Sequence, residues 1–279
     1  MKIAIQGIKG SYLHHVATVF FDVKIHFYAF LSFDILVDSL NNGLSEFGVM
    51  AIENSIAGSI IPNYSLIDKN NLYIIGEYYI NINHNLMVYP GVDLNQIKIV
   101  SSHPMALLQC KDYLKKIDKT IVEDKDTAEV AKRIIENKLL DTAAIASVEA
   151  SKLYGLDIIE RNIQTIKDNE TRFVVVSKLP DKKVISYANK ASLKFILSHK
   201  NGSLANILNI LSNYDMNLTK IQSIPIIETP WKYSFFIDTT FTDIKKYKKA
   251  IENVSSQSEY VKEFGVYDNF KSQWKQQRD

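Results

Sequence analysis

The sequence predicts an α/β protein with two lobes, followed by a smaller βαββαβ unit. From residue 2 to about 178, short apolar strands alternate with helices, which is typical of parallel sheets covered by helices. Two connections, near residues 80–86 and 160–170, divide this part into two lobes. After a polar connector the pattern changes to strand, helix, two strands, helix and strand, the order of a ferredoxin-like unit.

These observations give the expected domain bounds. The two-lobed part covers residues 1–178, with lobe 1 at about 1–80 and 161–178 and lobe 2 at about 81–160. A linker at 179–190 leads to the second domain at 191–270, and a polar tail covers 271–279.

The first lobe is predicted from strand–helix pairs. The expected elements are strands at 2–6, 25–30 and 47–52, helices at 11–21 and 32–42, and a further helix that starts at 56–59. A long extended segment at 72–89, interrupted by Asn81, Asn83, His84 and Asn85, is expected to cross between the lobes.

The same rhythm predicts the second lobe. Its expected elements are strands at 97–100, 120–122, 142–146 and 156–160, and helices from 104 to about 116, from 127 to 137 and from 147 to near 155. The βαββαβ unit has expected strands at 191–198, 217–227, 231–241 and 260–267 and helices at 202–214 and 243–254. This topology commonly leaves one sheet face for a partner subunit, so we expect a dimer.

Polar residues follow the predicted strands where each strand meets a helix. They are Ser11, Asn54, Ser55, Ser102, His103, Thr127 and Ser147. In open α/β sheets ligands bind beyond the carboxyl ends of the strands, where helix N-termini favour anions. Each serine or threonine also suits a simple helix cap, but their shared location predicts a cleft for an anionic ligand.

Thr171 and Arg172 stand at the entrance of an apolar strand, in the segment 169–177. An arginine fork can bind a carboxylate through two parallel hydrogen bonds. The alternative is a surface arginine beside a threonine with strand propensity.

Composition excludes several classes of function. A net charge of +2 does not indicate a nucleic-acid surface. The single cysteine, Cys110, rules out an internal disulfide and favours a reducing compartment, and its apolar neighbours predict a packed core thiol. The N-terminal segment lacks the apolar region of a secretion signal, so we expect a cytoplasmic protein. The six histidines show no metal-ligand spacing.

Six motifs in order resemble those of the prephenate dehydratase family, over nearly the whole chain. They are Gln6-Gly7 with Gly10-Ser11-Tyr12, Ile52-Glu53-Asn54-Ser55 with Ala57-Gly58-Ser59, Ser102-His103-Pro104 with Ala106 and Gln109-Cys110, Asp126-Thr127-Ala128, Ala144-Ile145-Ala146-Ser147, and Thr171-Arg172-Phe173.

The resemblance implies a two-lobed fold like a periplasmic binding protein and the conversion of prephenate to phenylpyruvate in phenylalanine biosynthesis, without a cofactor. It assigns the essential catalytic role to Thr171, and Arg172 is expected to bind a substrate carboxylate or to fix the cleft. The expected substrate-binding residues are Ser11, Asn54, Ser55, Ser102, Thr127 and Phe173. We expect no fused chorismate mutase domain.

Two motifs after residue 190 are Gly202-Ser203-Leu204 and Asn217-Leu218-Thr219-Lys220-Ile221-Gln222-Ser223-Ile224-Pro225. They resemble Gly-Ala-Leu and Asn-Leu-Thr-Lys-Ile-Glu-Ser-Arg-Pro of the ACT regulatory domain, which binds phenylalanine in this family. The expected effector-binding residues are Gly202, Ser203, Leu204, Asn217 and Leu218. Gln222 and Ile224 replace a glutamate and an arginine of the family motif, so a charge pair is missing and the effector itself is in question. A homodimer or homotetramer is expected.

Two alternatives stay open at this point. Arogenate dehydratase is an enzyme of the same fold with an amino-bearing substrate, and a non-catalytic two-lobe sensor would explain the cleft equally well.

Overall fold

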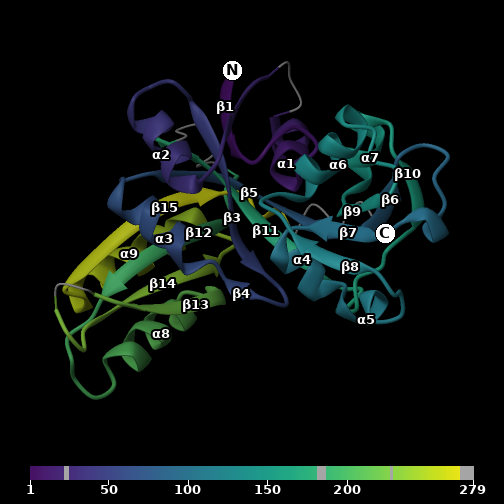
Figure 1. The fold of residues 1–279 in the computed structure, drawn as a ribbon. Helices are drawn as coiled ribbons and strands as arrows, with labels where there is room; N and C mark the ends of the chain where they lie inside the picture. The colour runs from purple at the N-terminus through teal and green to yellow at the C-terminus, as the bar shows by residue number, and fades with distance from the viewer. Residues whose placement is uncertain (22–24, 181–186, 227–228, 271–279) are drawn as a thin grey trace. The chain divides into compact units, whose positions relative to one another are not determined.

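A computed structural model of the chain describes residues 1–21, 25–180, 187–226 and 229–270 (Figure 1). The expected tail at 271–279 and residues 181–186 of the expected linker lie outside the described residues. The chain divides into two compact units. The first contains Met1–Gly58 and Tyr79–Phe173, and the second contains Ser59–Tyr78 and the chain from Val174 onward.

A sheet of parallel strands forms the start of the first unit. Its strands are β1 (Lys2–Gln6), β2 (His26–Phe30) and β3 (Phe47–Asn54), in the order β2-β1-β3. The sheet continues to β11 (Glu170–Ser177) and β5 (Tyr73–Asn81), each of which passes from one unit into the other, and β4 (Gly58–Ser59) pairs with β3. Helices α1 (Tyr12–Phe21) and α2 (Phe33–Asn41) contact β1 and β3.

The helix that we expected to start at 56–59 does not start there. Residues 55–57 form a turn, and α3 (Ile61–Lys69) begins only at Ile61, with a proline in its first turn. The side chain of Asn54 accepts hydrogen bonds from the backbone of Ile56 and Ala57, which stabilises the turn in competition with a helix. Gly58 has a φ of 81°, which is outside the helical range.

The second sheet is mixed rather than wholly parallel. Its strands are β6 (Asn85–Val88), β7 (Ile99–Ser102), β8 (Thr120–Glu123), β9 (Thr142–Ala146) and β10 (Asp157–Glu160), in the order β10-β6-β9-β7-β8. β7 is parallel to β8 and β9, whereas β6 is antiparallel to β9 and β10. The expected strand 72–89 is therefore two strands, β5 and β6, in different sheets, separated at residues 82–84.

Helices cover both faces of the second sheet (Figure 1). On one face lie α6 (Thr127–Glu136) and α7 (Val148–Tyr154), and on the other α4 (Pro104–Gln109) and α5 (Lys111–Leu114). The helix expected from 104 to 116 is thus two short helices that meet at Cys110. A 3-10 turn at Leu94–Gln96 precedes β7.

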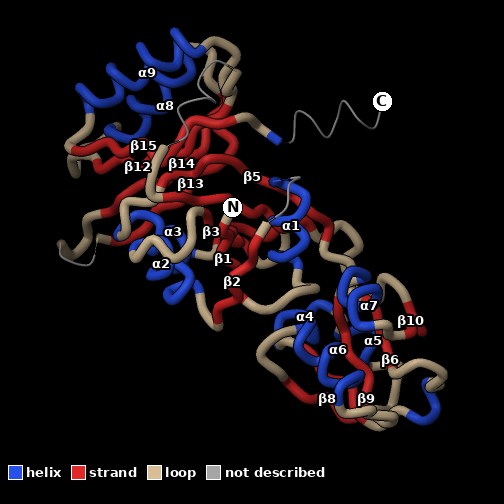
Figure 2. Tube along the Cα trace, turned by 90° about the horizontal axis from the view of Figure 1, so that it is seen from above, coloured by secondary structure: helices blue, strands red, loops and turns tan. Residues whose placement is uncertain are grey.

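The second unit contains the expected βαββαβ order. It consists of β12 (Lys190–Ile196), α8 (Ser203–Asn213), β13 (Asn217–Pro225), β14 (Tyr233–Thr240), α9 (Ile244–Gln257) and β15 (Tyr260–Tyr267). The antiparallel sheet has the order β13-β14-β12-β15. Helices α8 and α9 lie on one face and α3 on the opposite face (Figure 2).

Four lysines mark the face that α3 covers, and we call it the lysine face: Lys190, Lys194, Lys220 and Lys262. Lys190 Nζ lies 2.9 and 2.8 Å from the two carboxylate oxygens of Glu77 on β5. Asp68 of α3 pairs with both Lys194 and Lys262. Lys220 Nζ donates to Ser59 Oγ over 2.8 Å. Residues 59–78 of the same chain therefore cover the face for which we expected a partner subunit.

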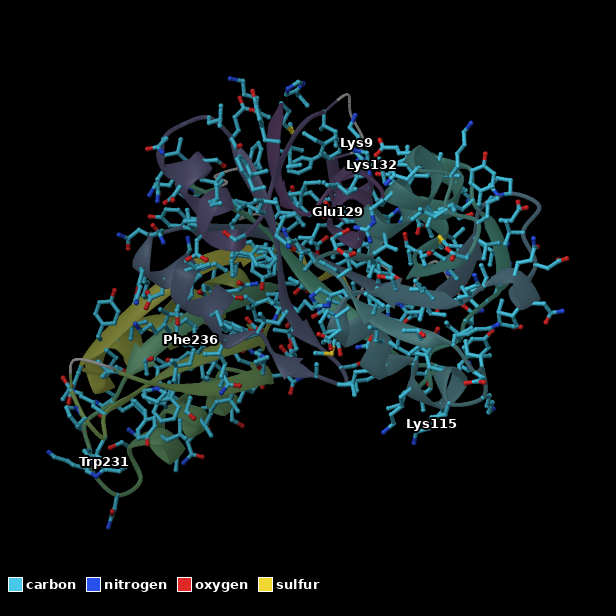
Figure 3. All side chains as sticks on the ribbon, in the orientation of Figure 1. Lys9, Lys115, Glu129, Lys132, Trp231 and Phe236 are labelled. Atoms are coloured by element: carbon cyan, nitrogen blue, oxygen red, sulfur yellow. The ribbon has the colours of Figure 1, made fainter. Side chains whose placement is uncertain are left out.

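Apolar contacts and close packing accompany these ion pairs. Tyr64 of α3 meets Phe236 of β14, which is labelled in Figure 3, with ring centroids 5.4 Å apart. A Cβ placed on Gly265 of β15 would lie 1.9 Å from the carbonyl oxygen of Ile74, so only glycine permits this approach of β15 to β5. In the described ranges, no helix is long and apolar enough to cross a membrane.

Candidate active site

Thr171 lies near the start of β11, where the chain returns from the second sheet, and its side chain is buried. The amide nitrogen of Asn54, at the end of β3, donates to Thr171 Oγ1 over 2.9 Å. The same nitrogen donates to Asn169 Oδ1 over 2.7 Å and makes a longer contact of 3.3 Å to the Glu170 carbonyl. Asn54 thereby joins the end of β3 to the start of β11.

The main chain fixes the orientation of the Asn54 amide. Its Oδ1 accepts from Ile56 N over 3.0 Å and from Ala57 N over 2.9 Å. Since the carboxamide oxygen only accepts and the nitrogen only donates, Nδ2 must face Thr171. Thr171 Oγ1 is therefore an acceptor in this bond and retains its own proton. No residue in the described part of the chain accepts that proton.

Further side chains extend this arrangement through what we call the amide chain: Asn54, Asn169 and Gln109. Asn169 Nδ2 donates to Gln109 Oε1 over 2.9 Å. The same Gln109 oxygen lies 2.8 Å from His84 Nε2. Gln109 ends α4, and His84 lies between β5 and β6. The amide chain thus links both sheets of the first unit.

The two connections between the sheets are hydrogen-bonded to each other beside the amide chain. Ile82 N donates to the Asn169 carbonyl over 2.6 Å, and Ile163 N donates to the His84 carbonyl over 2.8 Å. Thr165 N donates to the Gln109 carbonyl over 2.8 Å. Asn169, His84 and Gln109 are therefore held by their backbones as well as by their side chains.

Ser55 ties the turn after β3 to β11. Its backbone N donates to the Glu170 carbonyl over 2.8 Å, and its Oγ accepts from Glu170 N over 2.9 Å. The side chain is exposed. Ser55 therefore lies one residue from Asn54 and opposite the residue that precedes Thr171.

Ser11 and Ser102 both have intramolecular partners. Ser11 Oγ accepts from His14 N over 3.2 Å at the start of α1, so its proton is not used in that bond. Ser102 is fully buried, and its Oγ donates its single proton to the Ile145 carbonyl over 2.7 Å. Ser102 therefore fixes β7 to β9.

Thr127 begins α6, and Asp126 caps that helix by accepting from Ala128 N and Glu129 N. Burial raises the pKa of the Asp126 carboxyl, although the two backbone hydrogen bonds oppose this shift. The Thr127 hydroxyl is half-buried and has no hydrogen-bond partner within the described ranges.

The loop at residues 7–10 approaches the second sheet's helices closely. A Cβ on Gly7 would lie 2.7 Å from Asp126 Oδ2, and the φ of Gly7 is 85°. Ser147 Oγ donates to the Gly10 carbonyl over 3.0 Å. In Figure 3, Lys9 of this loop and Glu129 of α6 are labelled. The two sheets of the first unit thus meet at this loop as well as at the two connections.

Arg172 and Phe173 follow Thr171 along β11 and are both buried. Because successive side chains of a strand point to opposite faces, Arg172 faces away from the side that carries Thr171 and Phe173. The Arg172 side chain is 3% exposed and has interactions within the protein.

The structure separates the expected effector residues into two groups. Gly202, Ser203 and Leu204 follow the end of β12, whereas Asn217 and Leu218 begin β13. Both strands are antiparallel to β14, and Lys190 and Asn217 both pair with Thr240. β12 and β13 are therefore parallel, and the two groups lie at opposite ends of the sheet in one chain.

No group of three or more potential metal-ligating side chains occurs within residues 1–21, 25–180, 187–226 and 229–270. The prediction of a packed core thiol is confirmed, because Cys110 is fully buried among apolar residues such as Leu107 and Val100. Burial raises the pKa of the Cys110 thiol to about 12.

Sequence reasoning did not identify Asn169, Gln109 and His84 as parts of the site. Asn169 and Gln109 occur within the segments named above, and His84 interrupts an apolar stretch. A polar residue inside an otherwise apolar strand pattern was the available signal, because buried polar groups need partners.

Comparisons with known proteins agree with this architecture. The family model described as prephenate dehydratase matches residues 3–181. The bifunctional chorismate mutase/prephenate dehydratase of Buchnera aphidicola subsp. Acyrthosiphon pisum is 33% identical over 94% of this chain and 69% of its own length. The prephenate dehydratase of Methanocaldococcus jannaschii is 34% identical over 94% of this chain and 96% of its own length. Arogenate dehydratase/prephenate dehydratase 2 of Arabidopsis thaliana is 34% identical over 85% and 65%.

Solved structures resemble the fold over nearly the full length. The structure of GqqA, described as a novel type of quorum quenching acylase, has a TM-score of 0.83 at 25% identity and covers 96% of this chain and 98% of its own. The prephenate dehydratase of Arthrobacter aurescens, solved with L-Phe, has a TM-score of 0.83 at 24% identity, with 96% and 90% covered. The expected two-lobed α/β fold is confirmed, and the chain belongs to the prephenate dehydratase family.

Proposed function

We propose that Thr171 is the residue through which this chain performs the reaction of its family, the conversion of prephenate to phenylpyruvate. The substrate dianion loses carbon dioxide and its ring hydroxyl, and one proton must reach that hydroxyl for it to leave as water. The observation that carries the proposal is the 2.9 Å bond in which Asn54 donates to Thr171 Oγ1. It leaves the Thr171 proton available for the departing oxygen.

Asn54 also makes Thr171 a better donor. As Thr171 gives its proton toward the leaving hydroxyl, negative charge develops on Oγ1. A donor already aimed at that oxygen stabilises the charge without reorganisation. The proton on Thr171 is then replaced from solvent, so that the residue relays rather than supplies the net proton.

The remaining site residues fall into two groups, according to whether their polar hydrogens are free or are used in bonds within the protein. Thr127 and Ser11 retain hydroxyl protons and are our candidates to donate to the substrate carboxylates. The hydrogens of Asn54 and Ser102 are used within the protein, which favours roles in holding the site. The burial of Arg172 favours the second role expected for it, fixing the cleft, and we assign Phe173, on the same side of β11 as Thr171, to the wall of the site.

Removal of the Thr171 hydroxyl tests the proposal. In Thr171→Val, which keeps the shape of the side chain, we expect phenylpyruvate formation to fall by about a hundredfold to a thousandfold. Thr171→Ser should retain most activity, and Thr142→Val is a matched control on the buried strand β9. Near-normal turnover by Thr171→Val would remove this residue from the mechanism.

Arogenate is the second candidate substrate, because relatives named arogenate dehydratase are as similar as those named prephenate dehydratase. Both substrates carry the same leaving hydroxyl and differ in an amino group. Steady-state kcat/KM measured with each on the same preparation decides between them. Absence of product from both would favour a non-catalytic sensor.

The structural neighbour GqqA is described as an acylase, so acyl transfer is another candidate reaction. It is less compatible with the site than the loss of a hydroxyl. A nucleophilic threonine needs a base that removes its proton. In the described structure, the hydrogen-bond partner of Thr171 Oγ1 is an amide that donates to it.

We further propose that residues 191–270 form an ACT domain, that residues 1–178 form the catalytic domain, and that the protein acts in the cytoplasm as a homodimer or homotetramer. Phenylalanine is the proposed effector, and the βαββαβ order supports the domain assignment. Since the two effector groups lie at opposite ends of the sheet, a site that uses both needs more than one chain. Phenylalanine should therefore lower activity and change the sedimentation coefficient, and indifference at millimolar concentrations would contradict this.

A further inference from the structure

His84 is bonded to Gln109 at the end of the amide chain farthest from Thr171, and its ring is held inside the first unit. Its side chain is 2% exposed, and the ring lies edge-on to Tyr12 with centroids 6.3 Å apart. His84 N donates to Gln164 Oε1 over 3.0 Å, and the His84 carbonyl accepts from Ile163 N. The imidazole therefore has a fixed position beside Gln109.

The direction of every hydrogen bond in the amide chain follows from its other end. The backbone of Ile56 and Ala57 fixes Asn54 so that Nδ2 donates to Asn169 Oδ1. Asn169 must then present Nδ2 to Gln109 Oε1. An oxygen that accepts from Asn169 also faces His84, so His84 Nε2 must carry a hydrogen.

The second ring nitrogen of His84 supports the same protonation state. Nδ1 is buried and has no hydrogen-bond partner among the described residues. A hydrogen on Nδ1 would be a buried donor without an acceptor, which is costly, whereas a lone pair is tolerated more easily. Burial also lowers the pKa of His84, although the bond to Gln109 opposes the shift. Tyr12, the titratable side chain in ring contact with it, has a raised pKa because of burial and is neutral too.

We propose that His84 is a positioning residue for the reaction at Thr171, and that its Nε2–H holds the amide chain in the direction that the backbone of Ile56 and Ala57 imposes on Asn54. An amide group can turn over and exchange its donor and acceptor, which would reverse each bond. The neutral imidazole offers Gln109 a donor at Nε2, and Nδ1 on its other side has no acceptor among the described residues that would favour the opposite tautomer. This inference rests on the proposed role of Thr171.

The orientation of Gln109 has a second consequence for the site. With its oxygen committed to Asn169 and His84, the Gln109 amide nitrogen has no acceptor in the described residues and is not fully buried. His84 thereby keeps the Gln109 amide nitrogen directed outward, and through Asn169 it supports the Asn54 amide that leaves the Thr171 hydroxyl its proton.

Nitrogen NMR of the full chain tests the tautomer directly. In protein labelled with ¹⁵N-histidine at pH 7, we expect His84 to show a protonated Nε2 and an unprotonated Nδ1, assigned by the loss of its signals in His84→Gln. A proton on Nδ1 would overturn the inference. This result does not depend on turnover, so it is separate from the test of Thr171.

Activity tests whether the bond matters for catalysis. His84→Leu removes the donor, and we expect kcat to fall about tenfold to a hundredfold with little change in KM, because the reacting groups lose their alignment. His84→Gln places an amide nitrogen near the position of Nε2, and it should restore most of the loss.

A double variant separates positioning from a general structural effect. If His84 acts through the amide chain, adding His84→Leu to Asn169→Ala should lower kcat little further. Multiplicative losses, or failure of His84→Gln to restore activity although it melts like the parent protein, would overturn the inference. Near-normal turnover by Thr171→Val with the expected tautomer would instead overturn the proposed function.

Discussion

Asn54 donates its amide hydrogen to Thr171 Oγ1 over 2.9 Å, and it does so from an amide whose oxygen is already bound to two backbone N–H groups. The direction of this bond decides what Thr171 can do. A hydroxyl that accepts from Asn54 can donate outward, whereas a hydroxyl that donated to Asn54 would have no proton left for a substrate.

Reversal of this bond should abolish activity. Asn54→Asp replaces the donating nitrogen with an acceptor, so Thr171 would donate inward, and the added charge would repel a dianionic substrate. We expect kcat/KM to fall by at least about a hundredfold, measured as phenylpyruvate formation. Asn137→Asp, at the exposed end of α6, is the matched control. Activity of Asn54→Asp close to that control would contradict the assigned direction.

The close approach at Gly265 predicts a large loss of stability. Gly265→Ala would place its Cβ 1.9 Å from the Ile74 carbonyl oxygen, and both neighbours are backbone within strands. Relief requires β15 or β5 to move, so we expect a cost of about 1–3 kcal/mol, as for overpacked cores. Urea unfolding measures it, with Gly43→Ala as a comparison whose added Cβ meets no atom within 4 Å, so that any cost there comes from the φ of 71° and not from a close approach. A midpoint of Gly265→Ala equal to that of the parent protein would show that the approach is not tight.

Loss of one member of the buried ion pair should cost more than loss of both. Glu77→Gln leaves the Lys190 ammonium buried without its carboxylate, for which we expect a loss of about 3–5 kcal/mol. Glu77→Leu combined with Lys190→Met removes both charges and should be less destabilising. The comparison uses denaturant midpoints at one pH. A double variant as unstable as Glu77→Gln would argue against an uncompensated charge as the cause.

The ion pairs of Asp68 predict a stability that depends on pH. Burial alone would raise the pKa of Asp68, but the hydrogen bonds and charges of Lys194 and Lys262 lower it below its usual value. The unfolded chain then binds the proton more readily, so the contribution is present above about pH 3.9 and is lost as pH falls through the folded value. The difference in urea midpoint between the parent protein and Asp68→Asn should therefore shrink from pH 6 toward pH 3. A constant difference would contradict the shift.

Local patterns predicted most elements of the fold. The first and last strands, Lys2–Gln6 and Tyr260–Tyr267, have the expected bounds. Turns and polar residues at both ends of each apolar segment made these bounds predictable. The helix expected at 56–59 was wrong because a side chain, Asn54, supplied the hydrogen bonds of a turn. The sequence did not predict the break between β5 and β6, because apolar residues continue on both sides of His84.

The site was predictable only in part for a different reason. Thr171 and Asn54 stand at strand ends, which a strand–helix pattern reveals. Asn169 and Gln109 are 60 positions apart in the sequence, and Gln109 and His84 are 25 positions apart. The spacing of apolar and polar residues within a short segment does not predict partners at such separations. The coverage of the lysine face by residues 59–78 is a contact of the same kind.

That coverage has a consequence for anyone who divides the chain. The match to the family model ends at residue 181, which invites truncation at that point. Such a fragment would keep Glu77, Asp68 and Tyr64 but lack the strands that bear Lys190, Lys194 and Phe236. The Glu77 carboxylate, whose side chain is fully buried in the intact protein, would then be exposed to solvent. The face of α3 that carries Tyr64 would be exposed with it. Truncation at any single position in the sequence therefore does not separate the two units of this protein.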